Sequence, residues 1–502
     1  MEQLDLLVQG FAGALSPINL LWVVVGCLLG TAVGVLPGLG SSMAVALLLP
    51  MTFALDPTGA FILFAGVYFG GLFGDSTMAI LLNTPGQASA IASTFEGHKM
   101  ANDGRAPQAL ATAAIGAFVG GMVATILVVF VSPTLVKLSS SFGPAEFFAL
   151  ALFAFVATSS VVADNVLKGL SSLVVGIGIT LVGTDGISGL TRFTLGSPQL
   201  FDGISLVTVT VAVLALGEVL FVASRVRRDR EDLRVRGGGG RPFLNRRELA
   251  EAAPAWGRGT LIGLPFGVIP AGGAEVPTFL AYEAERRLDR RRRIPKFGKG
   301  AIRGLAAPEA AGNATTGMAM GALLALGLPV SSTAAIMLAA FGQYGLQPGP
   351  LLFENSADLV WPLLASFFLA MIVLLVINLP FAQLWAKLLL IPKPYLYAGI
   401  TLFCGLGIWA TSAAVFDLVL LLAIAVLGFL MRRYDYPVAP LMIGMVLGPL
   451  AETSLRDALL SSVGDPRVLV SSPITLVIYG LLLVVIALSV RSAVRKRTRR
   501  DL

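Results

Sequence analysis

One interrupted apolar stretch has residue types that suit anion binding. In GVLPGLGSSMAVALLLP (residues 34–50) a proline and glycines interrupt an apolar run long enough to cross a bilayer, and two serines follow. Proline removes a backbone donor and glycine allows the chain to change direction, so a helix must break here. A helix that restarts after the break presents free N–H groups and partial positive charge, which suit a carboxylate. The residues concerned are Pro37, Gly38, Gly40, Ser41 and Ser42.

Two further breaks repeat this chemistry, in NTPGQAS (83–89) and GLPVSST (327–333). Broken helices also free carbonyl oxygens, which can hold Na⁺. For each serine or threonine the alternative is a plain helix N-cap or a hydrogen bond between helices. The candidate residues are Asn83, Thr84, Pro85 and Gly86 in the first break and Gly327, Pro329, Ser331 and Ser332 in the second.

Ionisable residues inside apolar segments are the next candidates, because each is costly there. Asp75 precedes the break at Asn83 and is expected either to bind a cation or proton or to cap a short helix. Glu309 and Asn313 flank an expected half-helix start. Asn313 is a candidate substrate ligand. Glu309 either caps that start or, with Asp75, Pro37 and Gly327, takes part in cation coupling.

Other acidic residues are given structural roles. Glu218 lies near the end of its span and is expected at the membrane interface. Glu452 precedes Arg456 by four residues, the spacing of an ion pair on a helix. Glu275 and Glu283 lie near an arginine cluster, where ion pairing is expected.

The composition places the chain in a membrane. Hydrophobic residues make up 56% of the 502 residues and charged residues only 13%, against about 25% charged in soluble domains. A spanning helix needs about 20 apolar residues, so we expect about a dozen helices or half-helices. The first residues show no signal-peptide pattern. The chain has a single histidine, which excludes a histidine-based metal or catalytic cluster. Its two cysteines lie in separate apolar segments. No cofactor beyond Na⁺ is expected.

The net charge of +7 comes from lysines and arginines that crowd into a few loops. Such crowding is typical of cytoplasmic segments of membrane proteins. It predicts that the segment 225–248 and the C-terminal tail are cytoplasmic and that the N-terminus is outside. Nucleic-acid binding is disfavoured, because no aromatic residues are interleaved with the arginines.

The chain divides into two comparable halves. We predict a first membrane repeat at 1–224, a basic cytoplasmic linker at 225–257, a second membrane repeat at 258–490 and a basic cytoplasmic tail at 491–502. Pro37 corresponds to Pro270, and Pro85 to Pro329. Repeats with matching Gly and Pro interruptions are typical of secondary transporters and of their binding sites. The charges predict inverted repeats; chance similarity between Gly-rich and Ala-rich segments is the alternative. The fold class is therefore an all-α polytopic membrane protein with broken helices or re-entrant hairpins.

These motifs have a familiar order. The first half reads GxxPGLG…LLPMTF…YFGG…ILLNTPG…TFEGHKMANDGRAPQAL, and the second reads IPAGGAEVPTFLAYEAE…PEAAGNA…LGLPVSSTAA…GLQPGPLLF, followed by LMIGMVLGPLAETSLRDAL. From about residue 20 to about residue 460 the chain closely resembles the large membrane subunit of the tripartite tricarboxylate transporter family.

The resemblance implies a secondary transporter of the bacterial inner membrane. It imports tricarboxylates such as citrate, or related di- or monocarboxylates, on a Na⁺ or H⁺ gradient with a small membrane subunit and a periplasmic substrate-binding protein. An elevator-type motion and a homodimer are implied by similarity to other transporters with paired hairpins. Two positions depart from the family: Gly74–Asp75 replaces the usual Gly-Ser, and Gly312 replaces a second asparagine.

Three function classes follow. The first is this binding-protein-dependent importer. The second, a membrane-embedded enzyme, is disfavoured because no nucleophile and base occur in a recognisable arrangement. The third is a stand-alone carboxylate carrier or a passive channel, which uptake measurements separate from the first.

Overall fold

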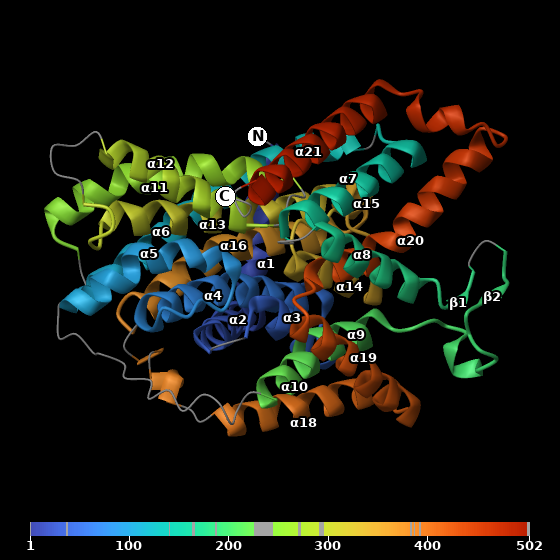
Figure 1. The fold of residues 1–502 in the computed structure, drawn as a ribbon, viewed down its shortest axis with the longest axis horizontal. Helices are drawn as coiled ribbons and strands as arrows, with labels where there is room; N and C mark the ends of the chain where they lie inside the picture. Colours follow the sequence, from blue (N-terminus) through green and yellow to red (C-terminus); the bar gives the residue numbers. More distant parts are fainter. Residues whose placement is uncertain are drawn as a thin grey trace.

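The structure, a computed structural model, describes residues 2–36, 39–139, 141–162, 166–185, 188–224, 244–269, 273–290, 296–381, 384–385, 387–390 and 393–498. The described residues are almost entirely helical (Figure 1). Pro37, Gly38 and Pro270 lie outside the described residues, as does 225–243 of the predicted linker.

The first half contains helices and one small hairpin. Its helices are α1 (Glu2–Ala14), α2 (Pro17–Val35), α3 (Ser41–Thr52), α4 (Pro57–Leu82), η1 (Ala88–Ala90), α5 (Ile91–Met100), η2 (Ala101–Arg105), α6 (Ala106–Ser139), α7 (Pro144–Val162), α8 (Val166–Thr180), η3 (Pro198–Leu200), α9 (Leu206–Thr210), η4 (Val211–Leu216) and α10 (Gly217–Ala223). Strands β1 (Gly183–Thr184) and β2 (Thr191–Arg192) pair antiparallel.

The first helix of the second half begins within the predicted linker. Helix α11 starts at Arg246, where Asn245 and Glu248 form a capping box, so residues 246–257 of the predicted linker are helical. The helices are α11 (Arg246–Phe266), α12 (Glu275–Arg290), α13 (Ile302–Leu326), α14 (Ser332–Gln343), α15 (Pro350–Asn355), α16 (Ala357–Asn378), η5 (Lys387–Leu390), α18 (Lys393–Ser412), α19 (Val415–Arg433), α20 (Val438–Ser461), η6 (Pro466–Val470) and α21 (Pro473–Thr498). Helix α21 therefore continues into the predicted tail.

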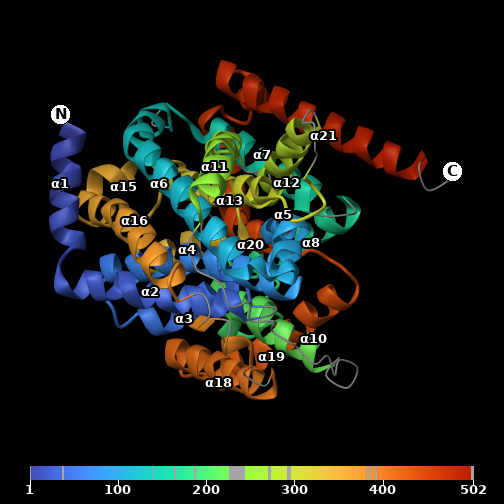
Figure 2. The same ribbon diagram turned by 90° about the vertical axis from the view of Figure 1, so that its left-hand side faces the viewer.

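The expected membrane fold is confirmed. Among the described residues, eight helical segments are long and apolar enough to cross a membrane, and shorter apolar helices such as α3 and α14 accompany them. Helices α18 and α21 lie at opposite margins of the molecule (Figures 1 and 2) and expose large apolar side chains such as Leu402 and Leu483. Such surfaces suit contact with lipid rather than water.

Helices α4 and α13 form the centre of the two halves. Every described residue from Gly59 to Ile80 and from Ile302 to Ala325 is buried. Both helices end at a residue in the left-handed conformation, Asn83 (φ 56°) and Gly327 (φ 67°), with a proline two residues later. The equivalent ends support the predicted correspondence of Pro85 with Pro329.

Glycines spaced four apart join each central helix to its neighbour. They are Gly26, Gly30 and Gly34 in α2, and Gly259 and Gly263 in α11 with Gly267 at its C-cap. A Cβ on any of them would lie 2.2–2.5 Å from a backbone oxygen of α4 or of α13, respectively. Only glycine allows backbones to approach this closely. The same spacing before each break shows that the halves share one helix–break–helix design.

The predicted ion pairs are mostly present. Glu452 pairs with Arg456 at 2.7 Å and also with Arg192 of β2. Glu283 pairs with Arg286 at 2.7 Å and with Arg287 at 3.3 Å, as expected from the arginine cluster. Glu218 pairs with Arg432 of α19.

Candidate functional site

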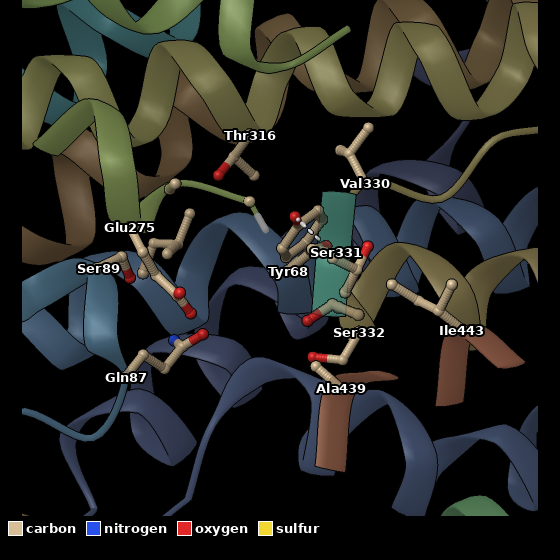
Figure 3. Close-up of a pocket in the computed structure, with 15 residues that line it drawn as sticks. Tyr68, Gln87, Ser89, Glu275, Thr316, Val330, Ser331, Ser332, Ala439 and Ile443 are labelled. Carbon is tan, nitrogen blue, oxygen red and sulfur yellow. Dashed lines mark hydrogen bonds between the residues drawn. The ribbon is translucent and has the colours of Figure 1, made fainter. Parts of the chain in front are cut away.

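A cavity of about 70 Å³ lies between the broken segments of the two halves (Figure 3). The first half contributes residues of α4 and of the segment after the first break. The second half contributes the starts of α12 and α14, Thr316 of α13, and Ala439 and Ile443 of α20 (Figure 3). The polar residues that line it include Tyr68, Gln87, Ser89, Glu275, Thr316, Ser331, Ser332 and Thr333. Residues from both halves of the chain therefore meet at this cavity.

Equivalent residues of the two repeats face this cavity. Leu72 and Thr316, Gln87 and Ser331, and Ser89 and Thr333 are separated along the chain by the same distance as Pro85 and Pro329. Two glycines make similar contacts with these residues: a Cβ on Gly40 would lie 3.5 Å from Gln87 Cγ, and one on Gly273 would lie 3.5 Å from Ser331 Cβ. The cavity thus occupies the contact between equivalent parts of the two halves.

The start of α14 has the predicted chemistry. Ser331 is the N-cap, and its Oγ accepts a hydrogen bond from the Ala334 N–H at 3.2 Å. The Tyr68 hydroxyl lies 2.9 Å from the same Oγ. The first N–H groups of a helix have no intrahelical acceptor. Those of Ser332 and Thr333, at the cavity wall, are therefore available to an anion.

The start of α3 differs from the expectation that Ser41 and Ser42 cap it. Gly40 is the N-cap and provides no side-chain cap. Ser41 is fully buried; its Oγ donates to Gln87 Oε1 at 3.3 Å and lies 3.4 Å from Thr333 Oγ1. Ser41 therefore links the first break to the start of α14 instead of capping its own helix.

The first break places its predicted residues in different surroundings. Asn83 and Thr84 are exposed, and Thr84 Oγ1 donates to the Leu82 carbonyl at 3.0 Å. Neither lines the central cavity. The N–H groups of Gly86 and Gln87 donate to Asp75, at 2.5 and 3.1 Å. Asp75 thus lies in mid-α4 and binds the backbone that follows Pro85, instead of capping the start of a short helix.

A smaller cavity beside the first collects the other candidates. Asp75, Glu309 and Asn313 line it together with Ser76 and Ser93. Ser76 and Ser93 donate hydrogen bonds to the two oxygens of Glu309, at 2.7 and 2.6 Å. The carboxylate is therefore held by one hydroxyl from α4 and one from α5.

The expected half-helix start at Glu309 and Asn313 is wrong. Both residues lie inside the continuous helix α13 and are buried, so Glu309 does not cap a helix. The Asn313 Nδ2 donates to the Glu309 carbonyl at 3.1 Å, whereas its buried Oδ1 has no hydrogen-bond partner among the described residues. Ala-rich and Gly-rich α13 tolerates Pro308 without breaking.

The remaining predicted residues belong to the second break. Gly327 is buried, and its left-handed conformation ends α13, where a Cβ would lie 2.7 Å from the Pro348 oxygen. Pro329 is buried between this turn and Ser331. Both residues shape the turn that brings the start of α14 to the cavity.

Sequence comparison decides the relationship that the motifs indicate. The model of the Tripartite tricarboxylate transporter TctA family matches residues 20–443. The chain belongs to this family. The family is one of transporters, and the chain is a multi-pass membrane protein of the large-subunit type in a tripartite system.

Two proteins of Agrobacterium vitis are similar to this TctA-family chain. One, described as an uncharacterized 52.8 kDa protein in the TAR-I ttuC' 3' region, is 39% identical over 499 residues, which cover 98% of each chain. Another, described as an uncharacterized protein in the TAR-II ttuC' 3' region, is 35% identical over 235 residues, which cover 47% of this chain and 96% of the relative. No solved structure matches the chain.

Both departures from the TctA-family pattern lie at the smaller cavity. Asp75 supplies the acceptor for the Gly86 and Gln87 N–H groups. Gly312 lines the cavity, and a Cβ there would lie 3.2 Å from Thr278 Cγ2. A larger side chain at position 312 would therefore crowd Thr278 of α12.

Several cavity residues were missed from the sequence. Glu275 was assigned to ion pairing, yet it lies at the cavity, and no ion pair of Glu275 occurs among the described residues. Gln87 and Ser89 lie within the quoted motif NTPGQAS, so the alignment of the two breaks could have found them. Tyr68 lies in an apolar helix and gave no comparable signal.

Proposed function

We propose that this chain imports small carboxylates as the large membrane subunit of a binding-protein-dependent secondary transporter. The observation that carries the proposal is the central cavity. Helices α12 and α14 begin at its wall, Gln87 and Ser89 before α5 also line it, and both halves of the chain contribute. Helix N-termini are suited to carboxylates. Placement at a repeat interface is typical of secondary transporters.

We infer that Na⁺ or H⁺ coupling uses the smaller cavity. Glu309, Ser76, Ser93 and Asn313 offer only oxygen ligands toward it, and the Asn313 Oδ1 has no partner in the described part of the chain. Oxygen ligands suit a hard cation. The two cavities share Leu72 and Ser89, so an ion at Glu309 would lie close to the substrate.

The remaining parts of the proposal follow the family. The partners are a small membrane subunit and a periplasmic substrate-binding protein, and the location is the bacterial inner membrane with the basic linker and tail in the cytoplasm. The repeats are inverted, and the motion is of the elevator type. A homodimer is the proposed assembly.

Uptake into proteoliposomes tests this function. Labelled mono-, di- and tricarboxylates are offered to liposomes that contain this chain and its small partner, with and without a Na⁺ gradient and a binding protein. The proposal expects saturable uptake that requires both. Uptake without the binding protein identifies the alternative, a stand-alone carrier, whereas flux that ignores every gradient identifies a channel.

The coupling site has its own test. Glu309→Gln removes the buried charge and keeps the side-chain size, so carboxylate uptake is expected to lose its dependence on the ion gradient. Glu354→Gln, at an exposed position of α15, is the matched control and is expected to keep it. An unchanged ion dependence in Glu309→Gln would remove Glu309 from coupling.

A further inference from the structure

The central cavity has two chemically different ends. In the view of Figure 3, Glu275, Gln87 and Ser89 lie at the left and Tyr68, Ser331 and Ser332 at the right. The right end holds the start of α14, whose first turn contains no acidic residue. The left end holds the start of α12, whose first turn contains Glu275. The two ends therefore offer a ligand opposite electrostatic environments.

At the α14 end, one carboxylate of a ligand finds suitable donors. The Ser332 and Thr333 N–H groups are free of intrahelical acceptors, and the helix adds partial positive charge. Helix α3, which also lacks an acidic residue in its first turn, contacts this end through Ser41 and Thr333. None of the described residues that line the cavity is lysine, arginine or histidine. The starts of α14 and α3 are therefore the main source of positive electrostatic potential for an anion in the cavity.

At the other end, negative charge is already present. Glu275 lines the cavity, and Asp75, which lines the neighbouring smaller cavity, accepts hydrogen bonds from the N–H groups of Gly86 and of the cavity residue Gln87. A second free carboxylate here would meet like charge in a poorly solvated site, which is strongly unfavourable. The cavity therefore favours acids that place only one carboxylate in it.

Gln87 decides which group fits beside Glu275. Its Oε1 accepts from Ser41 at 3.3 Å, which directs the amide, and its buried Nε2 has no hydrogen-bond partner among the described residues. A ligand group here has to accept from Gln87 Nε2 and donate to the Glu275 carboxylate. A hydroxyl group does both, whereas an ionised carboxylate only accepts.

We propose that Glu275, with Gln87, is a specificity-determining residue that selects acids with one free carboxylate and a hydroxyl or other hydrogen-bond donor at the opposite end. This inference rests on the proposed carboxylate transport and names the substrate class of the same cavity. A hydroxy acid satisfies both ends of the cavity, and a fully ionised dicarboxylate or tricarboxylate without such a donor does not.

Matched pairs of acids test this inference. Binding of 4-hydroxybutyrate and butyrate, and of 3-hydroxypropionate and propionate, is measured by calorimetry on the purified full-length chain, with succinate as a dicarboxylate; each pair has one carboxylate and differs by one hydroxyl at the opposite end. A hydrogen bond to a charged group predicts a preference of about tenfold or more for the hydroxy acid. Glu275→Gln is expected to reduce this preference to about threefold or less, because loss of the carboxylate lowers the affinity for the hydroxy acids and raises that for succinate.

Glu283→Gln is the control. It makes the same change on the same helix, at a residue paired with Arg286 and Arg287 outside the cavity, and is expected to keep the wild-type preference. The wild-type ratio requires no variant, so the test survives a Glu275→Gln protein that does not fold. Saturable binding of carboxylates without hydroxyl preference overturns this inference alone. Absence of carboxylate binding to the wild-type chain, together with absence of uptake by the assembled system, overturns the proposed function as well.

Discussion

The two halves of this TctA-family chain share one backbone design but complete it with different side chains. Each half packs a central helix, α4 or α13, against a glycine-bearing neighbour, and each central helix ends in a left-handed residue before a proline. Where α3 of the first half begins with Ser41 and Ser42, α12 of the second begins with Glu275. The backbone thus sets the place of the cavity, and the side chains set its polarity.

The segments after Pro85 and Pro329 also differ, but here it is the first half that has the carboxylate. The segment before α5 has its N–H groups bound by Asp75, whereas α14 is capped by the neutral Ser331. Each half therefore contributes one helix start with a carboxylate and one with hydroxyls only. The comparison teaches that two halves can share a backbone design while each contributes both acceptor and donor groups around the two cavities.

The largest effect is expected from substitutions that disrupt the glycine packing shared by both halves. Gly30→Leu and Gly263→Leu each place a side chain where a backbone oxygen lies 2.5 or 2.2 Å from a Cβ. Overpacking against backbone is expected to cost about 3 kcal/mol or more. The yield of monodisperse protein after membrane extraction measures this. Gly399→Leu, where no neighbour lies within 4 Å, is the control; equal yields for all three would contradict the shared packing.

The next largest effect is expected from placing a negative charge at the α14 end of the cavity. Ser332→Asp brings a carboxylate to this end and is expected to lower kcat/KM of carboxylate uptake about a hundredfold, because it repels the substrate carboxylate. Aspartate near a helix start is otherwise favourable, so folding is expected to persist. Ser332→Asn, of similar size without charge, is expected to lose much less. Similar kinetics for both variants would exclude the start of α14 from the site.

A smaller effect is expected at the first break. Asp75→Asn replaces a charged acceptor of the Gly86 and Gln87 N–H groups by a neutral one, which is expected to cost about 1–2 kcal/mol of unfolding free energy. Thermal unfolding in detergent measures it. Asp56→Asn is the matched control, since Asp56 caps α4 at an exposed position where asparagine caps equally well. An Asp75→Asn protein as stable as the control would contradict this role of Asp75.

The smallest effect is expected at Ser42. Its side chain has no hydrogen bond among the described residues, and Gly40 rather than a serine is the N-cap of α3. Ser42→Ala is therefore expected to change uptake less than about twofold and stability by less than about 0.5 kcal/mol. Loss of uptake in this variant would place the start of α3 within the substrate site.

The sequence predicted the fold class and the breaks because both depend on local chemistry. Apolar composition requires a membrane, and proline with glycine requires an interrupted helix wherever it stands. The cap at Ser331 and the ion pair of Glu452 with Arg456 follow from the same short-range rules. Family membership followed from the order of the motifs, and the match over residues 20–443 confirms it.

The errors arose where tertiary packing overrides local signals. Glu309 and Asn313 were expected to flank the start of a half-helix, but α13, which is buried on all sides, is continuous there. Glu275 was grouped with Glu283 because both lie near arginines in the sequence, yet only Glu283 has arginine partners within one helical turn. Which acid faces the cavity depends on how α12 docks, and docking cannot be read from spacing.

Two buried carboxylates bear on how the chain is made. Glu96 of α5 is fully buried, and its hydrogen-bond partners among the described residues all belong to the second half: Tyr282, Gly298, Gly300 and Ala301. Glu309 is in turn held by Ser76 and Ser93 of the first half.

During synthesis the first half enters the membrane before those partners exist. Its Glu96 side chain must then remain hydrated until the second half is inserted, because an unpaired charge in hydrocarbon is expensive. The hairpin of α4 and α5 consequently reaches its final position late in biogenesis, after residues 298–301 have been translated. The order of assembly is thus set by two acids as much as by the order of the helices.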